Sequence, residues 1–354
     1  MPEFHPVVVG LTLLAAFVGT LALRRYALAR QIIDTPNARS SHSVPTPRGG
    51  GVAIVLAYLT ALIFWEYRVG MAYGLFWSLL FGGGLIAVLG FWDDHAPLPA
   101  RVRFGFHLLA AGLAMFLLGG WPRLDLGGSS LYWGWLGYLS GVLLLAWAIN
   151  FYNFMDGIDG LAGSQAVFVA GAGGVMLSLT GGDGMPLWLL AAASAGFLLL
   201  NWPPARIFMG DAGSGFLGYA LFLHALYATT SGQTTLWPWM ILLAVFMTDA
   251  TLTLLRRALR GIRVTEAHRT HAYQWASRRA GAHRPVTLVI LCINLLVMLP
   301  AALATQAWPT IALPVCLLIF ALLVGLAWYF DAGVPESECA REAGVCPNRK
   351  SPDA

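Results

Sequence analysis

Eleven apolar runs divide this chain, and they limit its fold more strongly than any other feature. The runs cover residues 7–23, 52–67, 71–92, 104–120, 132–152, 161–180, 186–202, 215–230, 236–255, 286–307 and 310–330. A helix needs roughly 20 apolar residues to cross a bilayer, and only helices and closed barrels satisfy their backbone groups there. The sequence therefore predicts an all-α polytopic membrane protein with about 11 transmembrane helices.

Composition and charge support this prediction and orient the chain. Hydrophobic residues make up 58% of it and charged residues only 11%, against about 25% charged in a soluble domain. All but two of its 21 Lys and Arg residues lie on one side of the expected bundle, the exceptions being Arg68 and Arg123. The positive-inside rule makes that side cytoplasmic. We therefore expect a periplasmic N-terminus and a cytoplasmic C-terminus, and we attribute the basic balance to topology and anionic substrates, not to nucleic acid.

The expected organisation is one integral membrane domain, residues 1–330, followed by a polar cytoplasmic tail, residues 331–354. Polar residues concentrate in cytoplasmic loops that cover about 24–51, 93–103, 153–160, 203–214 and 256–284. The tail holds Cys339 and Cys346, but two thiols make no complete metal site. We interpret all four cysteines as free thiols.

Two amides and two carboxylates lie within ten positions at the end of the fifth run, in Asn150-Phe-Tyr-Asn153-Phe-Met-Asp156-Gly-Ile-Asp159. A helix would place Asn150, Asn153 and Asp156 on roughly one face. Carboxylate and amide oxygens suit a hard cation or the donor groups of a nucleotide. A helix cap needs one such residue, so four of them indicate a functional site.

Arg48 is followed by three glycines at the entrance of the second run. Such a segment can open a helix whose accessible backbone amides, beside a guanidinium group, favour phosphate. A flexible turn at the entrance of a span explains the glycines equally well. The residues alone leave both interpretations open.

Asp93 and Asp94 follow the third run directly, and Arg101 and Arg103 come after them. Adjacent carboxylates at a membrane surface are costly without a role. They could bind Mg²⁺, or one could accept a proton from an incoming phosphate. A purely topological role is a weak explanation, because acidic residues contribute little to orientation.

Two further aspartates stand in different surroundings. Asp211 lies between glycines in a segment that suits a tight loop presenting a carboxylate to a metal, or a plain turn with an Asp cap. Asp249 lies inside the ninth run, about two turns before Arg256 and Arg257. That separation is too long for a simple ion pair between residues on neighbouring helical turns. We expect Asp249 to bind a structural partner within the bundle.

His268, Arg269 and His271 lie close together in the last cytoplasmic loop. Histidine and arginine at this density on a predicted cytoplasmic face indicate anion ligands. The H-x-x-H spacing could instead supply two zinc ligands, although the sequence offers no third ligand of the usual kind. A basic cytoplasmic loop explains the arginines but not the histidines.

Taken together, these segments resemble the signature of the polyprenyl-phosphate N-acetylhexosamine-1-phosphate transferases, glycosyltransferase family 4. The resemblance extends from about Asp34 to Gln274. The matching patterns are D-x-P-N-x-R-x-x-H from Asp34, the aspartate pair, N-x-x-N-x-x-D-G-x-D-G-L from Asn150, M-G-D-x-G-S from Met209 and H-R-x-H-A-Y-Q from His268. The last pattern is similar to that of the branch that acts in O-antigen assembly.

This resemblance implies a reaction at the cytoplasmic face of the bacterial inner membrane. Undecaprenyl phosphate would attack a UDP-N-acetylhexosamine, giving undecaprenyl-pyrophosphate-sugar and UMP and initiating O-antigen or a related cell-envelope glycan. Mg²⁺, which Mn²⁺ could replace, would be held by Asp211 and Asn153, and Asp93, Asp94 and Asp211 would be catalytic. The other implied ligands are Asn150, Asn153, Asp156, Asp159 and Arg48 for the nucleotide sugar, and Arg103, His268, Arg269 and His271 for phosphates.

Two other classes of protein compete with this interpretation. A secondary transporter would carry polar groups near the bilayer midplane and repeats between its halves, whereas the acids here, Asp249 excepted, gather at one surface. A structural scaffold for a glycan assembly complex explains none of the acids. The sequence leaves open the sugar (GlcNAc, FucNAc, QuiNAc or a relative) and the choice between one displacement and a phospho-enzyme, and it is compatible with a homodimer.

Overall fold

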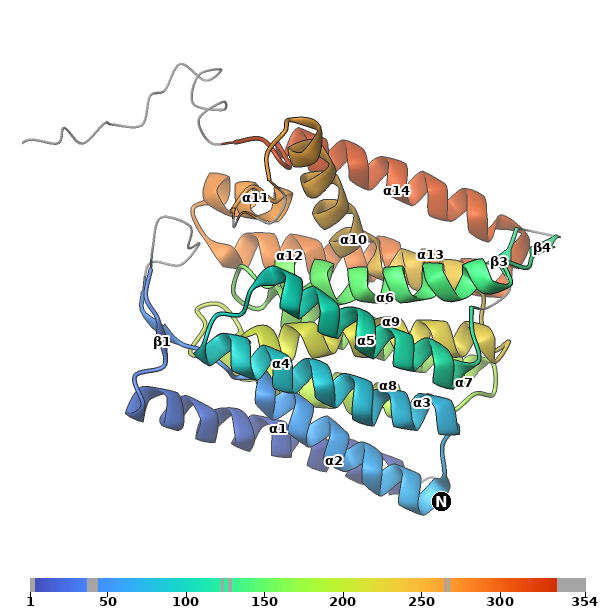
Figure 1. The fold of residues 1–354 in the computed structure, drawn as a ribbon, viewed down its shortest axis with the longest axis horizontal. Helices are drawn as coiled ribbons and strands as arrows, with labels where there is room; N and C mark the ends of the chain where they lie inside the picture. Colours follow the sequence, from blue (N-terminus) through green and yellow to red (C-terminus); the bar gives the residue numbers. More distant parts are fainter. Residues whose placement is uncertain are drawn as a thin grey trace, which may run out of the picture.

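The computed structural model describes residues 4–36, 44–121, 124–126, 129–263, 266 and 268–335, and its long helices run side by side in one bundle (Figure 1). The helices are α1 (Phe4–Ala29), α2 (Gly51–Val69), α3 (Tyr73–Trp77), α4 (Gly84–His95), α5 (Ala100–Leu118), α6 (Trp135–Phe154), α7 (Leu161–Leu179), α8 (Met185–Asn201), α9 (Asp211–Thr230), α10 (Leu236–Leu259), α11 (Ala272–Ala280), α12 (His283–Ile293), α13 (Leu299–Ala307) and α14 (Ala312–Tyr329). Short helical segments are η1 (Ser78–Gly83), η2 (Asn294–Met298) and η3 (Pro309–Ile311). The strands β1 (Ile33–Asp34) and β2 (Thr46–Pro47) pair antiparallel, as do β3 (Leu124–Asp125) and β4 (Ser130–Leu131).

A helix occupies every apolar run that the sequence singled out. The π-helical segments η1 and η2 join their neighbours into two continuous passages, Tyr73–His95 and His283–Ala307. Within the residues that the structure describes, nine passages are long and apolar enough to cross a membrane. The other two are α8, which has 17 residues, and α9, which is less apolar but buried along nearly its whole length. The prediction of an all-α polytopic membrane protein is confirmed.

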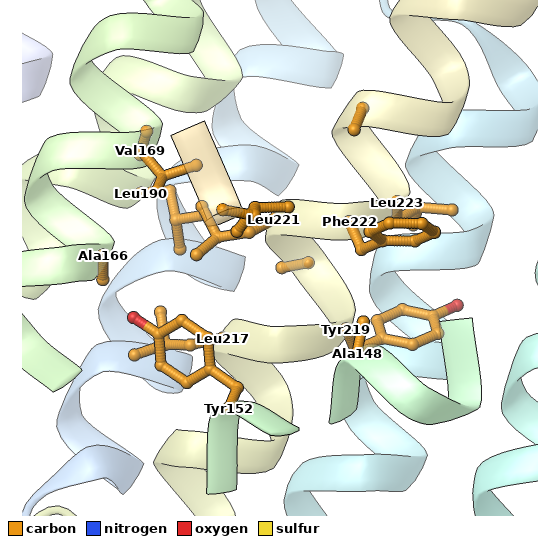
Figure 2. Close-up of a cluster of buried hydrophobic side chains, with 14 of the residues drawn as sticks. Ala148, Tyr152, Ala166, Val169, Leu190, Leu217, Tyr219, Leu221, Phe222 and Leu223 are labelled. Carbon is orange, nitrogen blue, oxygen red and sulfur yellow. The ribbon is translucent and has the colours of Figure 1, made fainter. Parts of the chain in front are cut away.

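Helix α9, which is not among the nine passages that meet the length and hydropathy of a membrane span, lies in the middle of the bundle. It packs against α2, α4, α6 and α7, and Figure 2 shows its Leu217 and Leu221 in the core with Val169 of α7. A side chain on Gly218 would place its Cβ 2.5 Å from the carbonyl oxygen of Ala148. Small residues are what allow helices to approach closely in a membrane, so α9 is placed by close packing and not by hydrophobicity alone.

The expected cytoplasmic segments gather at one end of the bundle, the left end in Figure 1, where β1 and α11 lie opposite the β3–β4 hairpin. The N–H of Gly51, at the start of α2, donates to the Met209 carbonyl just before α9. Near the other end of α2, Trp65 donates its Nε1–H to Asp183 at 2.9 Å. The turn between α7 and α8 therefore lies at the end of the bundle opposite to Asp211.

This arrangement gives a direct test of the predicted orientation. We expect a reporter fused at the C-terminus to be cytoplasmic and one inserted at Gly182, beside Asp183, to be periplasmic, because arginine-rich loops are retained inside. Paired phosphatase and fluorescent-protein fusions measure both positions. A C-terminal reporter that is active in the periplasm would overturn the positive-inside assignment.

The first residues of the expected polar tail belong to the folded bundle. Ala332 and Val334 are buried, and the Gly333 N–H donates to the Thr270 carbonyl at 2.8 Å. Arg256 donates to the Ala332 carbonyl at 2.7 Å. The boundary between domain and tail therefore lies a few residues beyond the end of α14. Residues 336–354, with Cys339 and Cys346, lie outside the described residues, whereas Cys292 and Cys316 are free thiols.

Candidate active site

Three aspartates and two arginines from distant parts of the chain meet at the end of the bundle where the expected cytoplasmic segments gather. Asp94 accepts backbone N–H groups from Asp211 at 3.0 Å and from Ala212 at 3.4 Å, so it caps the first turn of α9. A carboxylate at this position is favoured by the helix dipole. Arg48 Nη2 lies 2.8 Å from Asp94 Oδ1 and 2.7 Å from Asp211 Oδ1. Asp94 thus positions both the start of α9 and the Arg48 guanidinium.

Asp93 makes a similar arrangement on the other side of Asp211. Its Oδ2 lies 2.6 Å from Arg103 Nη1, and its Oδ1 accepts the Leu98 N–H at 2.6 Å. The same Arg103 nitrogen lies 3.4 Å from Asp211 Oδ2. The two oxygens of Asp211 therefore face two different guanidinium groups, one from the loop before α2 and one from the first turn of α5. Two adjacent carboxylates hold those two arginines in place.

The amide side chains reach this cluster from the end of α6. Asn153 hydrogen-bonds the Asp211 side chain and donates its Nδ2–H to Ser214 Oγ at 2.9 Å. Asp156 does not lie on the helical face that carries Asn150 and Asn153, because α6 ends at Phe154. That part of the sequence prediction is wrong: Asp156 lies in the turn that follows the helix.

Burial raises the pKa of Asp156 well above its ordinary value, and the charges of Asp211, Asp94 and Asp159 act in the same direction. The nearby Arg48 guanidinium opposes this shift without cancelling it. Asp156 is therefore harder to ionise here than a carboxyl group in water. Additional positive charge in the site would favour its ionised form.

The glycines after Arg48 allow close packing, and the backbone amides of two of the three are already bonded. The N–H groups of Gly50 and Gly51 donate to the carbonyls of Phe208 and Met209 at 2.9 and 2.8 Å. A Cβ on Gly51 would lie 2.4 Å from the Gly213 Cα. The occupied amides of Gly50 and Gly51 favour a packing role for these two glycines, and binding of phosphate at this segment stays a prediction. The preceding part of the motif, residues 37–43, lies outside the described residues.

Asp159 lies in a separate polar pocket of about 560 Å³. Its Oδ2 accepts the Ala205 N–H at 3.0 Å, and its Oδ1 lies 3.0 Å from His283 Nδ1. The ring of Phe208 and the guanidinium-bearing Arg284 also line this pocket. It therefore combines a fixed carboxylate, an aromatic ring and a cation.

Asp249 holds the start of α11, the helix that follows the H-R-x-H segment. Its carboxylate accepts the N–H groups of Ala272 and Tyr273, each at 2.9 Å, and lies 3.2 Å from His271 Nδ1. Tyr273 in turn donates its hydroxyl to the Phe154 carbonyl at 2.9 Å. The prediction of a structural partner for Asp249 within the bundle is confirmed, and the resulting chain of contacts ends at the residue after Asn153.

The three residues assigned to phosphate in the last loop have different surroundings. His271 is buried beside Asp249, and its ring stacks on that of His268 with centroids 5.0 Å apart. Burial, together with the neighbouring His271 and Arg257, lowers the pKa of His268 to about 3. His268 is therefore neutral at physiological pH and would meet a phosphate as a hydrogen-bond donor without charge. The Arg269 carbonyl accepts a hydrogen bond from Arg278, and the roles of all three toward phosphate stay predictions.

The carboxylate cluster has the donor chemistry that a magnesium ion requires. Within the described residues, no group of three or more His, Cys, Asp and Glu side chains could hold a metal by itself. Mg²⁺ differs because it is commonly held by one or two carboxylates, with water and substrate phosphates completing its shell. Asp211 and the neighbouring amide of Asn153 fit that pattern.

Two site residues escaped the sequence analysis. His107 of α5 lies 3.1 Å from the Asn150 amide nitrogen, and His283 pairs with Asp159. Each is an isolated histidine without a motif around it, so their partners could be found only from the fold.

Comparison with known proteins identifies relatives along most of the chain. A family model described as glycosyl transferase family 4 matches residues 76–229. The chain is 30% identical to the probable undecaprenyl-phosphate N-acetylglucosaminyl 1-phosphate transferase of Bacillus subtilis, covering 88% of this chain and 89% of the relative. It is 28% identical to the undecaprenyl-phosphate alpha-N-acetylglucosaminyl 1-phosphate transferase of Yersinia pestis, over 78% of each. It is 29% identical to the decaprenyl-phosphate N-acetylglucosaminephosphotransferase of Mycolicibacterium smegmatis, over 80% of this chain and 78% of the relative.

Proposed function

Because the chain belongs to the polyprenyl-phosphate N-acetylglucosamine-1-phosphate transferases of glycosyl transferase family 4, we propose that it transfers GlcNAc-1-phosphate from UDP-GlcNAc to undecaprenyl phosphate. The products are undecaprenyl-pyrophosphate-GlcNAc and UMP, and the lipid product starts a cell-envelope glycan such as O-antigen. The observation that carries the proposal is the cluster in which Arg48 and Arg103 both contact Asp211. Phosphoryl transfer requires such positioned charge more than any covalent chemistry by the protein.

The polar pocket around Asp159 is the proposed nucleotide site. A uracil ring offers an N–H donor to the Asp159 carboxylate and a flat face to the Phe208 ring, and Arg284 can meet the ribose-phosphate. The Phe208 carbonyl binds Gly50, two residues from Arg48. The nucleotide pocket and the carboxylate cluster are thus adjacent along one loop, which suits a UDP-sugar whose pyrophosphate reaches the arginines.

In the proposed reaction, Asp94 and Asp93 orient Arg48 and Arg103 toward the reacting phosphates. Asp211 and Asn153 would hold Mg²⁺, or Mn²⁺ in its place. When bound, the metal neutralises the pyrophosphate and the charge that develops on the leaving UMP. Preorganised charges of this kind stabilise the transition state without rearrangement at the moment of reaction.

The proposed setting is the bacterial inner membrane, with the site at its cytoplasmic face. Nearly all basic loops, the carboxylate cluster and the nucleotide pocket lie at the same end of the bundle. UDP-sugars are made in the cytoplasm, which agrees with that orientation.

The direct test is a panel of UDP-sugars with purified protein and undecaprenyl phosphate, with UMP as the measured product. We expect UMP release from UDP-GlcNAc that requires both the lipid phosphate and Mg²⁺, stops with a chelator and returns with Mg²⁺ or Mn²⁺. UDP-glucose, which lacks the N-acetyl group, is the matched control sugar. Release from a different UDP-N-acetylhexosamine alone would reassign the sugar, and no release from any UDP-sugar would exclude the transferase activity.

A further inference from the structure

We infer that His107 binds the phosphate of the polyprenyl acceptor, an inference that rests on the proposed function. His107 lies one turn after Arg103 on the same face of α5. Both residues line a cavity of about 40 Å³ that Asp93 and Asp211 also border. His107 is thus placed beside the reacting groups, although no sequence motif contains it.

Asn150 determines which nitrogen of His107 carries the proton. Asn150 Nδ2 donates to the Ala146 carbonyl at 2.7 Å, which identifies that atom as the amide nitrogen, because two facing carbonyl oxygens would repel each other. Its other N–H points to His107 Nδ1 at 3.1 Å. Nδ1 is therefore the acceptor, and the proton of the neutral ring lies on Nε2.

The Nε2–H of His107 is a donor available to a ligand. Within the described part of the chain, His107 Nε2 has no hydrogen-bond partner. It is not one of the fully buried polar atoms without a partner, so a ligand can reach it. A donor at the edge of this cavity can bind an acceptor that enters it. The phosphate oxygens of a substrate supply one, while Arg103 supplies the charge on the same face.

The shape and place of the cavity point to the lipid phosphate and away from the UDP-sugar. About 40 Å³ is room for roughly two or three water-sized groups, so it suits phosphate oxygens but not a base or a sugar ring. Apolar side chains of α4 and α6, including Leu89 and Ile149, line the rest of it. The pocket around Asp159 shares none of these lining residues. The acceptor phosphate, which arrives from the bilayer, is therefore the fitting occupant.

The test measures binding of undecaprenyl phosphate to the full-length protein in detergent, with undecaprenol as the neutral lipid control. His107→Leu fills the space without a donor, and we expect it to weaken undecaprenyl phosphate binding about tenfold or more. His107→Gln should bind within about threefold of the native protein, because an amide can both accept from Asn150 and donate to phosphate. Undecaprenol binding should be the same in all three proteins. In turnover, the KM for undecaprenyl phosphate should rise in His107→Leu, while the KM for UDP-GlcNAc stays within about twofold.

Three results would overturn the inference. His107→Leu could bind undecaprenyl phosphate as tightly as the native protein, or it could lose affinity for undecaprenol as much as for undecaprenyl phosphate. Alternatively, His107→Gln could bind undecaprenyl phosphate no better than His107→Leu. His107→Ala replaces the Leu variant if that protein does not fold, as judged by gel filtration. The binding arm needs no turnover. A native protein that binds undecaprenyl phosphate through His107 but releases no UMP would therefore reject the proposed function and leave this inference standing.

Discussion

Asn in place of Asp211 is expected to lower kcat by at least about 1,000-fold while the protein stays folded. Asp211 is the most exposed of the three clustered aspartates, with its side chain 20% accessible against 8% for Asp93 and 3% for Asp94. It is therefore the carboxylate best placed for a metal, whose stabilisation of transition-state charge is worth several kcal/mol, or about three powers of ten in rate. The change keeps the side-chain volume, and the Asp94 cap binds only the backbone of this residue.

The loss of turnover in Asp211→Asn should be accompanied by weaker Mn²⁺ binding, which electron paramagnetic resonance measures without substrate. Asp183→Asn is the matched control, because Asp183 bonds Trp65 at the opposite end of the bundle. That variant should turn over at the native rate. Substantial activity of Asp211→Asn at ordinary Mg²⁺ concentrations would reject the assignment of Asp211 as a metal ligand.

The membrane architecture could be predicted from the sequence because the bilayer imposes one simple requirement on every span. Apolar length alone located even α8 and α9, although neither meets the length and hydropathy of a typical span. The helices also extend beyond the apolar runs: α4 continues through Asp93 and Asp94 to His95. Those carboxylates are therefore presented from a rigid helical turn and not from a loop.

Local patterns failed where a contact with a distant segment decides the structure. Regular spacing predicted one helical face for Asn150, Asn153 and Asp156, but α6 stops at Phe154, where Tyr273 binds the carbonyl. A Cβ on the following Gly157 would meet the Tyr273 hydroxyl. The end of α6 is thus fixed by a residue far along the chain, which spacing within the motif could not reveal.

In the candidate site, too, the sequence indicated which residues matter but not which groups they contact. Sequence reasoning selected Asp93 and Asp94 because charged groups at a membrane surface need a role, and Asp211 because its flanking glycines suit a loop that presents a carboxylate. The fold does bring these three together. Sequence reasoning could not tell that Asp93 and Asp94 accept backbone N–H groups, while the Asp211 oxygens face the guanidinium groups of Arg48 and Arg103. That difference depends on the packing of α4 against α9.

The second large effect is expected at Asp249, where Ala should destabilise the protein and disturb the loop between α10 and α11. The substitution leaves the buried N–H groups of Ala272 and Tyr273 and the ring of His271 without their acceptor. An unsatisfied buried polar group costs about 1–3 kcal/mol, so three of them should cost at least about 3 kcal/mol. Thermal unfolding in detergent measures this loss, and Thr253→Ala is the matched control, because it removes one neutral donor to Asp249 and leaves the other three contacts.

If Asp249 only stabilised α11, the fraction of the Asp249→Ala protein that folds would show native kinetics. We expect more, because Tyr273 links this helix to the Phe154 carbonyl, beside Asn153. Release of the start of α11 should therefore lower kcat in the folded fraction as well as its stability. Asp249→Asn keeps one acceptor oxygen but turns an amide donor toward the remaining N–H groups, so it should fall between the native protein and Asp249→Ala in both measurements. Native stability in Asp249→Ala would show that water or another group accepts the N–H groups at the start of α11. The contacts that link Asp249 through Tyr273 to Phe154, beside Asn153, would then contribute nothing to the free energy of unfolding.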